Sequence, residues 1–477
     1  MVFALVLVPL ALAGLAWFAP DGRLRRWLIP TGAAVHAALT LAILRNPPPP
    51  ALDGWLVVGP LGRLVLGFIS AYYLLCSLYA PGYLAEHPDR NQKHFCAAML
   101  FFLSMMTLII LSHHLGVMWV AMEATTLAAA PLVYFNHTPR SLEATWKYLL
   151  IGSVGIALAL LGSFFLAYSA LHEGLGSSLL FEDLVRNAPR LSKPWLHAAF
   201  VVLFVGYGTK MGLAPMHTWK PDAYGEAPGL VGALLAGGLT NCAFLAILRF
   251  HQVVIAAGEG AFARQVMVVM GLLSMSVAAV FMVRQRDFKR MLAYSSVEHM
   301  GILILGVGIG GLGAFASLLH MINNGFTKGV LFLSAGNIQR AYLSKVTDQV
   351  GGALRVVPVS AALFLAGFFA ITGSPPFGPF ISELTILSAA LGAGKYLVAG
   401  LFLLLLGVVF VGMGATVMAV VQGTPSEQTP PNGSRDRFAT TAPIFVFLAV
   451  ILVLGCWIPG PLDRSLHQAA QFLEGGR

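Results

Sequence analysis

Residues 208–228 decide the fold, and they read GTKMGLAPMHTWKPDAYGEAP. Lys210 ends an apolar run, Pro215 follows five residues later, and the chain leaves through a segment that carries Asp222 and Glu226. Proline removes a backbone donor and clashes with the preceding turn, so a membrane helix broken here needs protein groups or trapped water for its freed polar groups. An ionisable group at the centre of a membrane helix costs about 2.5 to 3.5 kcal/mol on insertion scales, which favours a functional role. We therefore predict a broken helix with Lys210 at the centre of an ion path.

The composition is that of a polytopic membrane protein. The chain is 57% hydrophobic and 10% charged, with a mean hydropathy of +0.79. Its formal charge of +9 lies mostly in short loops, which membrane topology explains without nucleic acid. The cysteines are scattered singly, at Cys76, Cys96, Cys242 and Cys456. They form no disulfide, zinc or iron–sulfur pattern, so we expect no metal, cofactor, redox centre or catalytic site in this chain.

Apolar windows of roughly 20 residues can be placed about fourteen times. The first, from Met1 to Ala19, lacks a positively charged start and is read as a retained span. The windows begin near Phe3, Trp27, Leu64, His94, Leu115, Ala144, Trp195, Leu230, Ala263, Met291, Leu312, Val356, Tyr396 and Thr441.

Loop charge sets the orientation. The densest basic cluster, residues 284–290, follows the ninth window, and every loop after an odd-numbered window falls on the same side. The positive-inside rule makes that face cytoplasmic and places both termini outside. Two linkers stand out: the stiff proline run at residues 46–50 and the Pro/Ser/Asn-rich segment 423–437, in which we expect tolerance to sequence change. The other basic residues on the predicted cytoplasmic side are Arg23, Arg25, Arg26, Arg90, Lys93, Arg140, Arg340, Lys345, Arg435 and Arg437.

A second broken helix is predicted at residues 372–379, TGSPPFGP, just before Glu383. Lys210 is on the seventh window and Glu383 on the twelfth, so the two segments cross in opposite directions, as in an inverted repeat with discontinuous helices. The same offset relates Glu123 to Glu298 and His299, and Lys147 to Lys328. We expect two five-helix repeats and four segments: residues 1–92 with three spans, 93–256 and 257–422 as the repeats, and 423–477 as a cytoplasmic loop and last span.

Three groups of polar residues are the candidate site. Glu123 and Lys147 are expected to pair and to tune Lys210, the alternative being a structural ion pair. An unpartnered buried amine favours its neutral form, so Lys210 can exchange a proton; the alternative is snorkelling to the interface. His320, Asn324 and Lys328 are spaced four apart on one helix face, which suits a relay, although a lone membrane histidine is more often a helix–helix hydrogen-bond donor.

Other polar residues carry weaker signals. Glu298, His299 and His217 are possible relay residues, while Lys220, Asp222 and Glu226 read as a solvated loop cluster. Residues 306–311 match the spacing of a dinucleotide-binding loop, but no strand precedes them, so a turn or close helix packing is expected. The pair His113-His114 has no partner pair at metal-ligand spacing.

Five stretches carry a recognisable pattern: WVAMEATTL (119–127), LEATWKY (142–148), residues 208–228, DFKRMLAYSSVE (287–298) and PPFGPFISE (375–383). Together they resemble the proton-translocating antiporter-like subunits of the complex I and Mrp superfamily, and within it the component F type of hydrogenase-4 and formate hydrogenlyase complexes. The resemblance covers nearly the whole chain. It implies fourteen helices in two inverted five-helix units, and it gives proton-translocating roles to Glu123, Lys147, Lys210, His320, Lys328 and Glu383.

The chain departs from the superfamily pattern at three positions. Asn241 stands where some relatives have a lysine on the eighth span, Asn324 where they often have histidine, and Lys220 where leucine is usual. These departures place more of the predicted relay on His320 and Lys328, with Asn241 and Asn324 as possible relay residues. The chain also lacks the long lateral helix of some relatives.

The resulting hypothesis is a proton-translocating subunit of an energy-converting redox complex, resembling a group 4 hydrogenase, in a bacterial cytoplasmic membrane. Its expected partners are other membrane and peripheral subunits and the lipid bilayer, and the ion is the proton or sodium. Three alternatives stay open: a subunit of a sodium/proton antiporter, a proton-driven partner of an inorganic-carbon uptake complex, and a scaffold that transports nothing.

Overall fold

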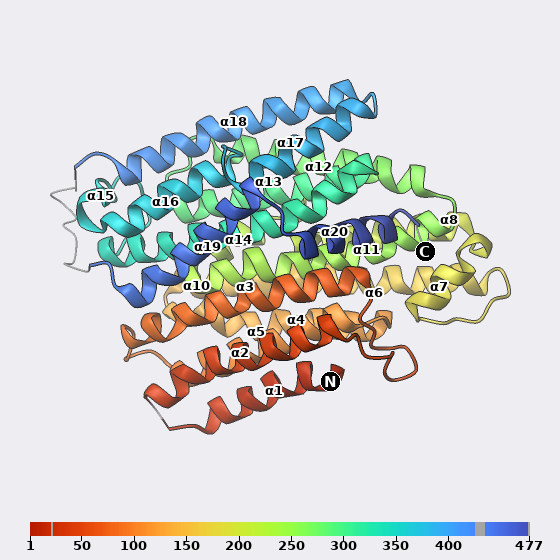
Figure 1. Ribbon diagram of the computed structural model, residues 1–477, viewed down its shortest axis with the longest axis horizontal. Coiled ribbons are helices and arrows are strands. Elements are labelled where there is room, and N and C mark those ends of the chain that lie inside the picture. The colour runs from red at the N-terminus through yellow and green to blue at the C-terminus, as the bar shows by residue number, and fades with distance from the viewer. Residues whose placement is uncertain (21, 425–434, 476–477) are drawn as a thin grey trace.

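The computed structural model describes residues 1–20, 22–424 and 435–475, which form a bundle of helices running mainly along the longest dimension of the molecule (Figure 1). These residues contain no β-strand, and their sheet-like pairing is limited to four isolated bridges, such as the one between Asp287 and Val346. The all-α prediction is therefore confirmed. Most of the predicted linker 423–437 lies outside the described residues.

Ten helices in the described ranges are long and apolar enough to cross a membrane. Each predicted window nevertheless coincides with helical structure. Four predicted windows are not among these ten helices. They are the first window, the two windows whose helices carry Lys210 and Lys328, and the twelfth window, which forms two short helices. The chain is thus an integral membrane protein, while fourteen crossings and the four segment boundaries remain proposals.

Three helices precede the first predicted repeat, and the third of them reaches both halves of the molecule. α3 packs against α2 and α4 on one side and against α14, α19 and α20 on the other. The proline run 46–50 is non-helical and connects α2 to α3. The bounds are α1 (Val2–Phe18), α2 (Arg23–Arg45) and α3 (Pro60–Ala85).

The first predicted repeat contains the longest helix in the described residues, α6. It begins where Pro139 occupies the first helical turn and Thr138 and Ser141 form a reciprocal capping box. A six-residue π-helical segment, Leu234–Leu239, lies within the eighth window. The helices are α4 (Gln92–Leu111), α5 (Leu115–Val133), α6 (Pro139–Leu171), α7 (Phe181–Asn187), α8 (Lys193–Met211), α9 (Trp219–Glu226), α10 (Gly229–Ala233) and α11 (Thr240–Ala256), with 3₁₀ turns at Tyr134–Asn136 and Ala188–Arg190.

The second predicted repeat is built around α14, most of whose residues are buried. α13 starts at an Asp287 cap, whose side chain accepts hydrogen bonds from the backbone N–H groups of Lys289 and Arg290. Close packing explains the glycine motif at 306–311, as expected: a Cβ on Gly308 would lie 2.9 Å from the Arg264 carbonyl oxygen. The helices are α12 (Gly260–Met282), α13 (Phe288–Ile309), α14 (Leu312–Tyr342), α15 (Ala353–Val356), α16 (Pro358–Ile371), α17 (Gly378–Gly392) and α18 (Tyr396–Val421).

The last window ends in a break that the sequence windows did not predict. α19 (Phe438–Cys456) stops, and α20 (Gly460–Leu473) then packs Leu466 and Leu473 inward against α3 and α14. The break lies beside the one between α16 and α17, because a Cβ on Gly455 would come within 1.9 Å of the Pro376 carbonyl oxygen. Two interrupted helices therefore meet in the second half of the chain.

Charged residues pair in the helix connections near α15, and α15 lies at the end of the bundle away from the two chain termini (Figure 1). Lys345 contacts Glu226 at 2.7 Å and Asp287 at 3.2 Å, and Glu86 contacts both Arg340 and Arg437. These ion pairs join connections that follow odd-numbered windows, as the loop charges predicted. That this end faces the cytoplasm remains a proposal.

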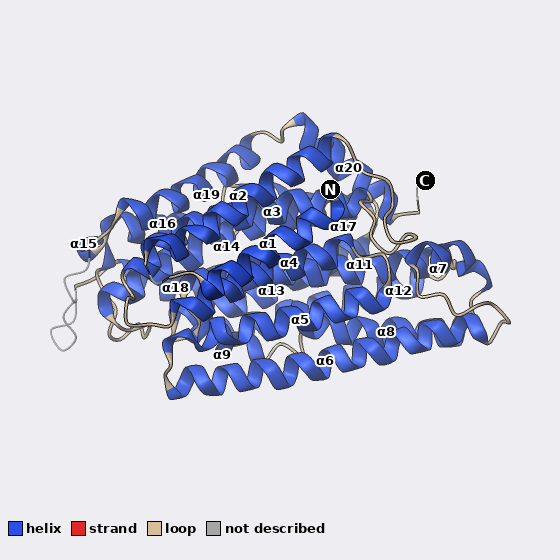
Figure 2. Cartoon of the chain, turned by 90° about the horizontal axis from the view of Figure 1, so that it is seen from below, coloured by secondary structure: helices blue, strands red, loops and turns tan. Residues whose placement is uncertain are grey.

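Glycine allows α6 and α8 to approach closely, and they lie side by side at one edge of the molecule (Figure 2). A Cβ at Gly206 would lie 2.6 Å from the Ala159 amide nitrogen and 2.8 Å from the Gly155 carbonyl oxygen, distances at which a backbone must move. Small residues at such crossings are what membrane helix packing requires.

We therefore expect Gly206→Ala to destabilise the protein by about 1–3 kcal/mol, as overpacking does. The measurement is thermal unfolding in detergent, followed by size-exclusion chromatography. Gly400→Ala on α18 is the matched control, because no atom lies within 4 Å of the added Cβ. Equal melting temperatures for the two variants would contradict the close approach.

Candidate functional site

Lys210 lies in the last turn of α8, and its side chain is fully buried. Its Nζ donates a hydrogen bond to Thr126 Oγ1 on α5 and lies 5.0 Å from the centre of the Tyr148 ring on α6. A Cβ at Gly152 would come within 3.1 Å of this nitrogen, so the glycine leaves room for the amine. The amine is thus enclosed by protein, which rules out the snorkelling alternative.

The predicted break follows Lys210 at once. α8 ends at Met211 and is capped by Gly212, whose φ of 79° is left-handed, and α9 begins at Trp219. Protein groups take up the freed backbone: Trp219 Nε1 donates to the Thr209 carbonyl at 2.9 Å, and the Ala214 amide donates to Ser274 Oγ at 3.1 Å. A break satisfied in this way is tolerated at membrane depth, and it holds Lys210 beside non-helical backbone.

Glu123 is connected to Lys210 through a hydroxyl group. Thr126 Oγ1 accepts from the Lys210 amine and donates to Glu123 Oε2 at 3.0 Å, while Ser153 Oγ on α6 donates to Glu123 Oε1 at 2.7 Å. Glu123 is half-buried and lines a cavity of about 380 Å³ between α5 and α6. A change of charge at this cavity therefore reaches Lys210 through one intervening side chain.

The predicted pairing of Glu123 with Lys147 is wrong. Lys147 Nζ contacts Glu143 Oε1 at 2.6 Å and Asp222 Oδ2 at 2.9 Å, and its side chain is 44% exposed at the charged end of the bundle. Glu123 instead contacts α6 at Ser153, six residues further along, which corresponds to about 9 Å of helix. Spacing within each helix did not fix the register between them.

This arrangement is tested by two double-mutant cycles on thermal stability. Glu123→Gln with Lys147→Met is expected to be additive within about 0.5 kcal/mol, because the two residues share no partner. Glu123→Gln with Thr126→Val is expected to show coupling of about 0.5–3 kcal/mol, since these side chains are bonded. Coupling in the first pair and none in the second would restore the original pairing.

Lys220 is not part of a solvated cluster, contrary to the sequence interpretation. Its side chain is fully buried, with the Nζ 5.8 Å from the centre of the Tyr224 ring and without a hydrogen-bond partner in the described part of the chain. It packs under Gly212, where a Cβ would lie 2.2 Å from its Cε. Asp222 and Glu226 do lie at the charged end, so Lys220 is the one charged residue of α9 that is fully buried.

The polar stripe on α14 is buried. His320, Asn324 and Lys328 are each 0% exposed, and Lys328 Nζ donates to Ser295 Oγ on α13 at 2.8 Å. Both polar atoms of the Asn324 side chain lack a hydrogen-bond partner among the described residues. Polar atoms buried in this way usually bind ordered water, which suits a relay between residues that do not touch.

His320 connects the polar stripe on α14 to the helix that follows the second break. Its Nε2 lies 3.0 Å from His299 Nδ1, and its Nδ1 lies 2.9 Å from Ser382 Oγ on α17. Glu298 and Glu383 are 1% and 5% exposed, and each has one carboxylate oxygen without a hydrogen-bond partner in the described ranges. His299 and Glu298, weak candidates in the sequence, are thus brought to the same site as His320 and Glu383.

The remaining relay candidates are placed differently. Asn241 is fully buried one residue after the start of α11, where its Nδ2 donates to the Gly237 carbonyl within the π-helical segment at 2.8 Å. π-helical turns are frequent at functional sites. His217 lies in the first break, with its Nδ1 3.3 Å from the Pro215 carbonyl oxygen, and no contact joins it to Lys210.

Sequence reasoning missed the small polar residues that connect the ionisable groups: Thr126, Ser153, Ser295, Asn323 and Ser382. Thr126 is three residues from Glu123 and so shares its helix face, a signal that was readable. Asn323 Nδ2 donates to the Gly378 carbonyl at 2.8 Å and thereby serves the second break. That contact crosses between helices, so it has no local sequence signature.

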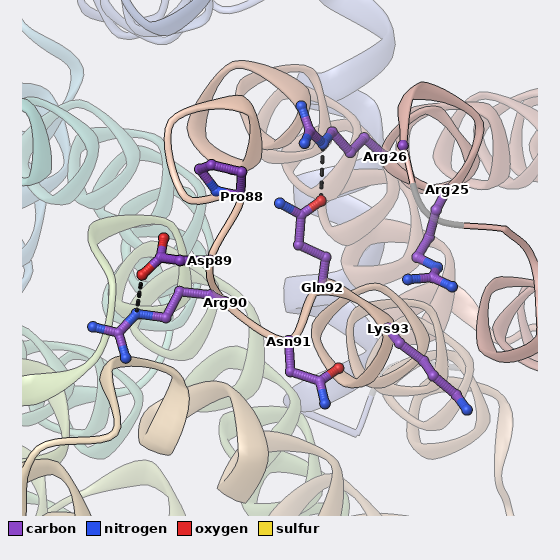
Figure 3. A pocket seen from close by; sticks show the side chains of 9 residues that line it. Arg25, Arg26, Pro88, Asp89, Arg90, Asn91, Gln92 and Lys93 are labelled. Atoms are coloured by element: carbon purple, nitrogen blue, oxygen red, sulfur yellow. Dashed lines mark hydrogen bonds and ion pairs between the residues drawn. The ribbon is translucent and has the colours of Figure 1, made fainter.

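A basic pocket of about 490 Å³ lies apart from this site, at the ends of α2 and α4 (Figure 3). Arg26 Nε donates to Gln92 Oε1 at 2.8 Å, and Arg90 pairs with Asp89 at 3.5 Å. Lys93 and Arg25 also line it. A basic surface at helix ends is typical of the face that meets anionic lipid headgroups, and it belongs to the predicted cytoplasmic side.

Comparison with known proteins agrees with this architecture. The family described as "NADH:quinone oxidoreductase/Mrp antiporter, TM" matches residues 112–411. The hydrogenase-4 component F homolog of Methylacidiphilum infernorum is 36% identical, over 79% of this chain and 78% of that protein. The NADH-quinone oxidoreductase subunit N of Desulforudis audaxviator is 32% identical, over 86% of this chain and 81% of that protein.

A solved structure is similar over almost the whole chain. One chain of respiratory complex I from Thermus thermophilus superimposes with a TM-score of 0.78 at 25% identity, covering 95% of this chain and 97% of that chain. The matched segment 112–411 contains both broken helices and every ionisable residue of the candidate site. The chain is therefore a member of the NADH:quinone oxidoreductase/Mrp antiporter transmembrane family.

Proposed function

We propose that this chain moves protons across a bacterial cytoplasmic membrane as one subunit of an energy-converting redox complex of the hydrogenase-4 kind. The observation that carries the proposal is the buried Lys210 at a helix break, bonded through Thr126 to a half-buried Glu123. Family membership supports it, as does the similarity to a hydrogenase-4 component F homolog and a quinone oxidoreductase subunit. Other subunits of such a complex are the expected partners.

The first step is electrostatic. Redox chemistry in another subunit changes the charge next to the cavity at Glu123. This charge change alters the strength of the hydrogen bond between Thr126 and Glu123. The hydroxyl is shared with the Lys210 amine, so the stability of the charged amine changes with it. In a low-dielectric interior such an interaction is several times stronger than in water. Lys210 then takes or releases one proton.

The second step is transfer across the centre of the bundle. Lys220, Asn241 and Asn324 present buried polar atoms that have no protein partner in the described ranges, and these suit a short chain of water between the two breaks. Lys328 receives the proton and passes it through His320 and His299. Imidazole can accept a proton at one nitrogen while it donates from the other.

The last step is release of the proton at Glu383. Along the chain, Glu383 follows the second break, whereas Lys210 precedes the first. Gly373, in the second break, leaves room for the carboxylate: a Cβ there would lie 2.2 Å from Glu383 Oε2. The first break thus lies beside a buried amine, and the second break lies beside a buried carboxylate. The basic end of the bundle faces the cytoplasm in this scheme, with both termini outside.

Sodium/proton antiport is the second candidate, because the matched family also includes Mrp antiporters. The described site favours the proton: its members are mainly amines and imidazoles, whereas hard cations prefer several oxygen ligands. Ion substitution in vesicles that contain the purified complex separates the two. Proton movement that requires sodium supports the antiporter, and movement in its absence supports the redox pump.

The parent complex is tested by purification. A tag on this chain is expected to recover a nickel–iron large and small subunit, identified by mass spectrometry after mild detergent extraction. Recovery of other antiporter subunits without any redox protein would overturn the assignment to a hydrogenase. The same preparation supplies the material for transport measurements.

A further inference from the structure

We propose that His299, His320 and Glu383 form a binding site for a divalent transition-metal ion of the zinc type. The bound ion blocks proton movement through the chain. The residues come from α13, α14 and α17, and all three are buried. One ligand atom from each lies within 4.8 Å of the others. Their sequence positions match no metal-binding spacing, which is why the sequence predicted no metal site.

The donor set has the chemistry of zinc ligation. Two imidazole nitrogens and one carboxylate oxygen make a three-ligand site that leaves a fourth tetrahedral position open. With bonds of about 2.0–2.2 Å, neighbouring ligand atoms of a tetrahedral zinc are about 3.4 Å apart. The two ring nitrogens are 3.0 Å apart, so they need to separate only slightly while Glu383 closes in.

The surroundings orient these ligands. His320 Nδ1 is held by Ser382 Oγ at 2.9 Å, and that hydroxyl donates to the Pro379 carbonyl at 3.0 Å. This bond directs the opposite ring nitrogen, Nε2, toward His299. Metal-binding histidines are usually fixed in this way by a partner on the other nitrogen.

An independent observation points to a missing cationic partner. Glu383 is 5% exposed, yet its Oε1 makes no hydrogen bond to any described residue. A buried carboxylate oxygen without a partner is costly, and a metal ion satisfies it directly. The carboxyl group of Glu383 belongs to the same cluster as the two histidine rings.

The local charge also suits a dication. Glu298 is 1% exposed, and its Oε2, which also lacks a hydrogen-bond partner in the described chain, lies 3.9 Å from His299 Nε2. Two carboxylates therefore match the two positive charges of the ion. The backbone of Lys328 lies about 12 Å from that of His320 along α14, and its amine, which is bonded to Ser295, is an electrostatic neighbour of Glu298, His299 and His320.

Binding occupies the nitrogen lone pairs that proton transfer through His299 and His320 needs. The predicted inhibition of transport thus rests on the proposed function, whereas metal binding itself does not. The two can be measured separately on one preparation.

The experiment titrates Zn²⁺ into the purified, chelator-treated complex by calorimetry, with Co²⁺ as a spectroscopic probe of tetrahedral coordination. His320→Gln and Glu383→Gln are each expected to weaken binding by about 100-fold. Glu383→His is expected to retain it, because three histidines also form a zinc site. The matched control is His36→Gln, which alters a buried histidine bonded to Ser70 and Thr107 and is expected to leave binding unchanged.

Equal affinity of the native complex and His320→Gln, or loss of binding in Glu383→His as well, would overturn the site. Each variant is first shown to be monodisperse in the assembled complex. If Zn²⁺ binds as described and proton movement continues unchanged, the metal site stands and the proposed transport route through these histidines fails. If transport in the native complex stops over the same Zn²⁺ concentrations at which the calorimeter shows binding, both are supported.

Discussion

Replacing Lys210 by methionine is expected to reduce redox-coupled proton movement to background, a loss of about 100-fold or more, which is the scale of a lost acid–base group. The side chain is fully buried, and its amine is bonded to Thr126 beside the first break, so the substitution removes the exchangeable proton at that point. Methionine fills a similar volume without exchanging a proton. The measurement is fluorescence quenching of a pH-sensitive dye in vesicles containing the purified complex.

Two further variants separate proton exchange from charge and from helix integrity. Lys210→Arg keeps the positive charge but cannot release a proton, so it is expected to fail as Lys210→Met does. Lys193→Met removes a lysine from the first turn of the same helix, where it pairs with Glu259 at 2.8 Å and its side chain is 62% exposed. This control is expected to change transport little, as surface ion pairs contribute about 0–1 kcal/mol. Normal pumping by Lys210→Met would refute the proposed function.

The fold was predictable from the sequence because its main signals are local. Apolar windows mark the helices, and Pro215 and the Pro375-Pro376 pair mark the two breaks. Bilayer physics turns each signal into structure, since a spanning segment must satisfy its own backbone. The break between α19 and α20 was missed because Pro459 follows the last window, where a helix would end in any case.

The site was predictable in composition but not in its contacts. Burial of Lys210 and Lys328 follows from their position in long apolar segments. The partners of Lys147 depend on how α5, α6 and α9 are aligned, and no spacing within one helix contains that information. Lys220 shows the same limit: Pro221 and Asp222 suggested an exposed loop, whereas α9 buries the Lys220 side chain beneath Gly212.

The equal offset of charged residues in the two halves has a restricted meaning. It also related Lys147 to Lys328, and these two residues differ completely in environment; the two broken helices were indicated by their prolines and not by the offset. Lys147 is 44% exposed in surface ion pairs, whereas Lys328 is fully buried beside Ser295. Residues at equivalent positions of the two proposed repeats can therefore differ in environment, so a shared offset does not by itself assign a shared role.

Lys328→Met is accordingly expected to stop proton movement by a similar factor, about 100-fold, while leaving the contacts of Lys210 intact. Lys328 lies two turns from His320 on α14, so its loss interrupts the route between the two breaks and not the coupling at Glu123. Redox turnover of the complex, measured in parallel, is expected to persist or to fall together with pumping. Proton movement at the native rate in this variant would show that the second repeat does not carry the proton.

The matched control for that experiment is a lysine that is equally buried but bonded to the scaffold. Lys289 is 0% exposed, and its Nζ donates to the Ala227 carbonyl and to Gln339 Oε1. Lys289→Met is expected to cost about 1–3 kcal/mol of stability, because it leaves buried acceptors unpaired, without changing the number of protons moved per electron. Both variants remove a buried lysine. If transport is lost in Lys328→Met but not in Lys289→Met, the cause is therefore the position of the Lys328 amine relative to the two breaks and not the loss of a buried lysine as such.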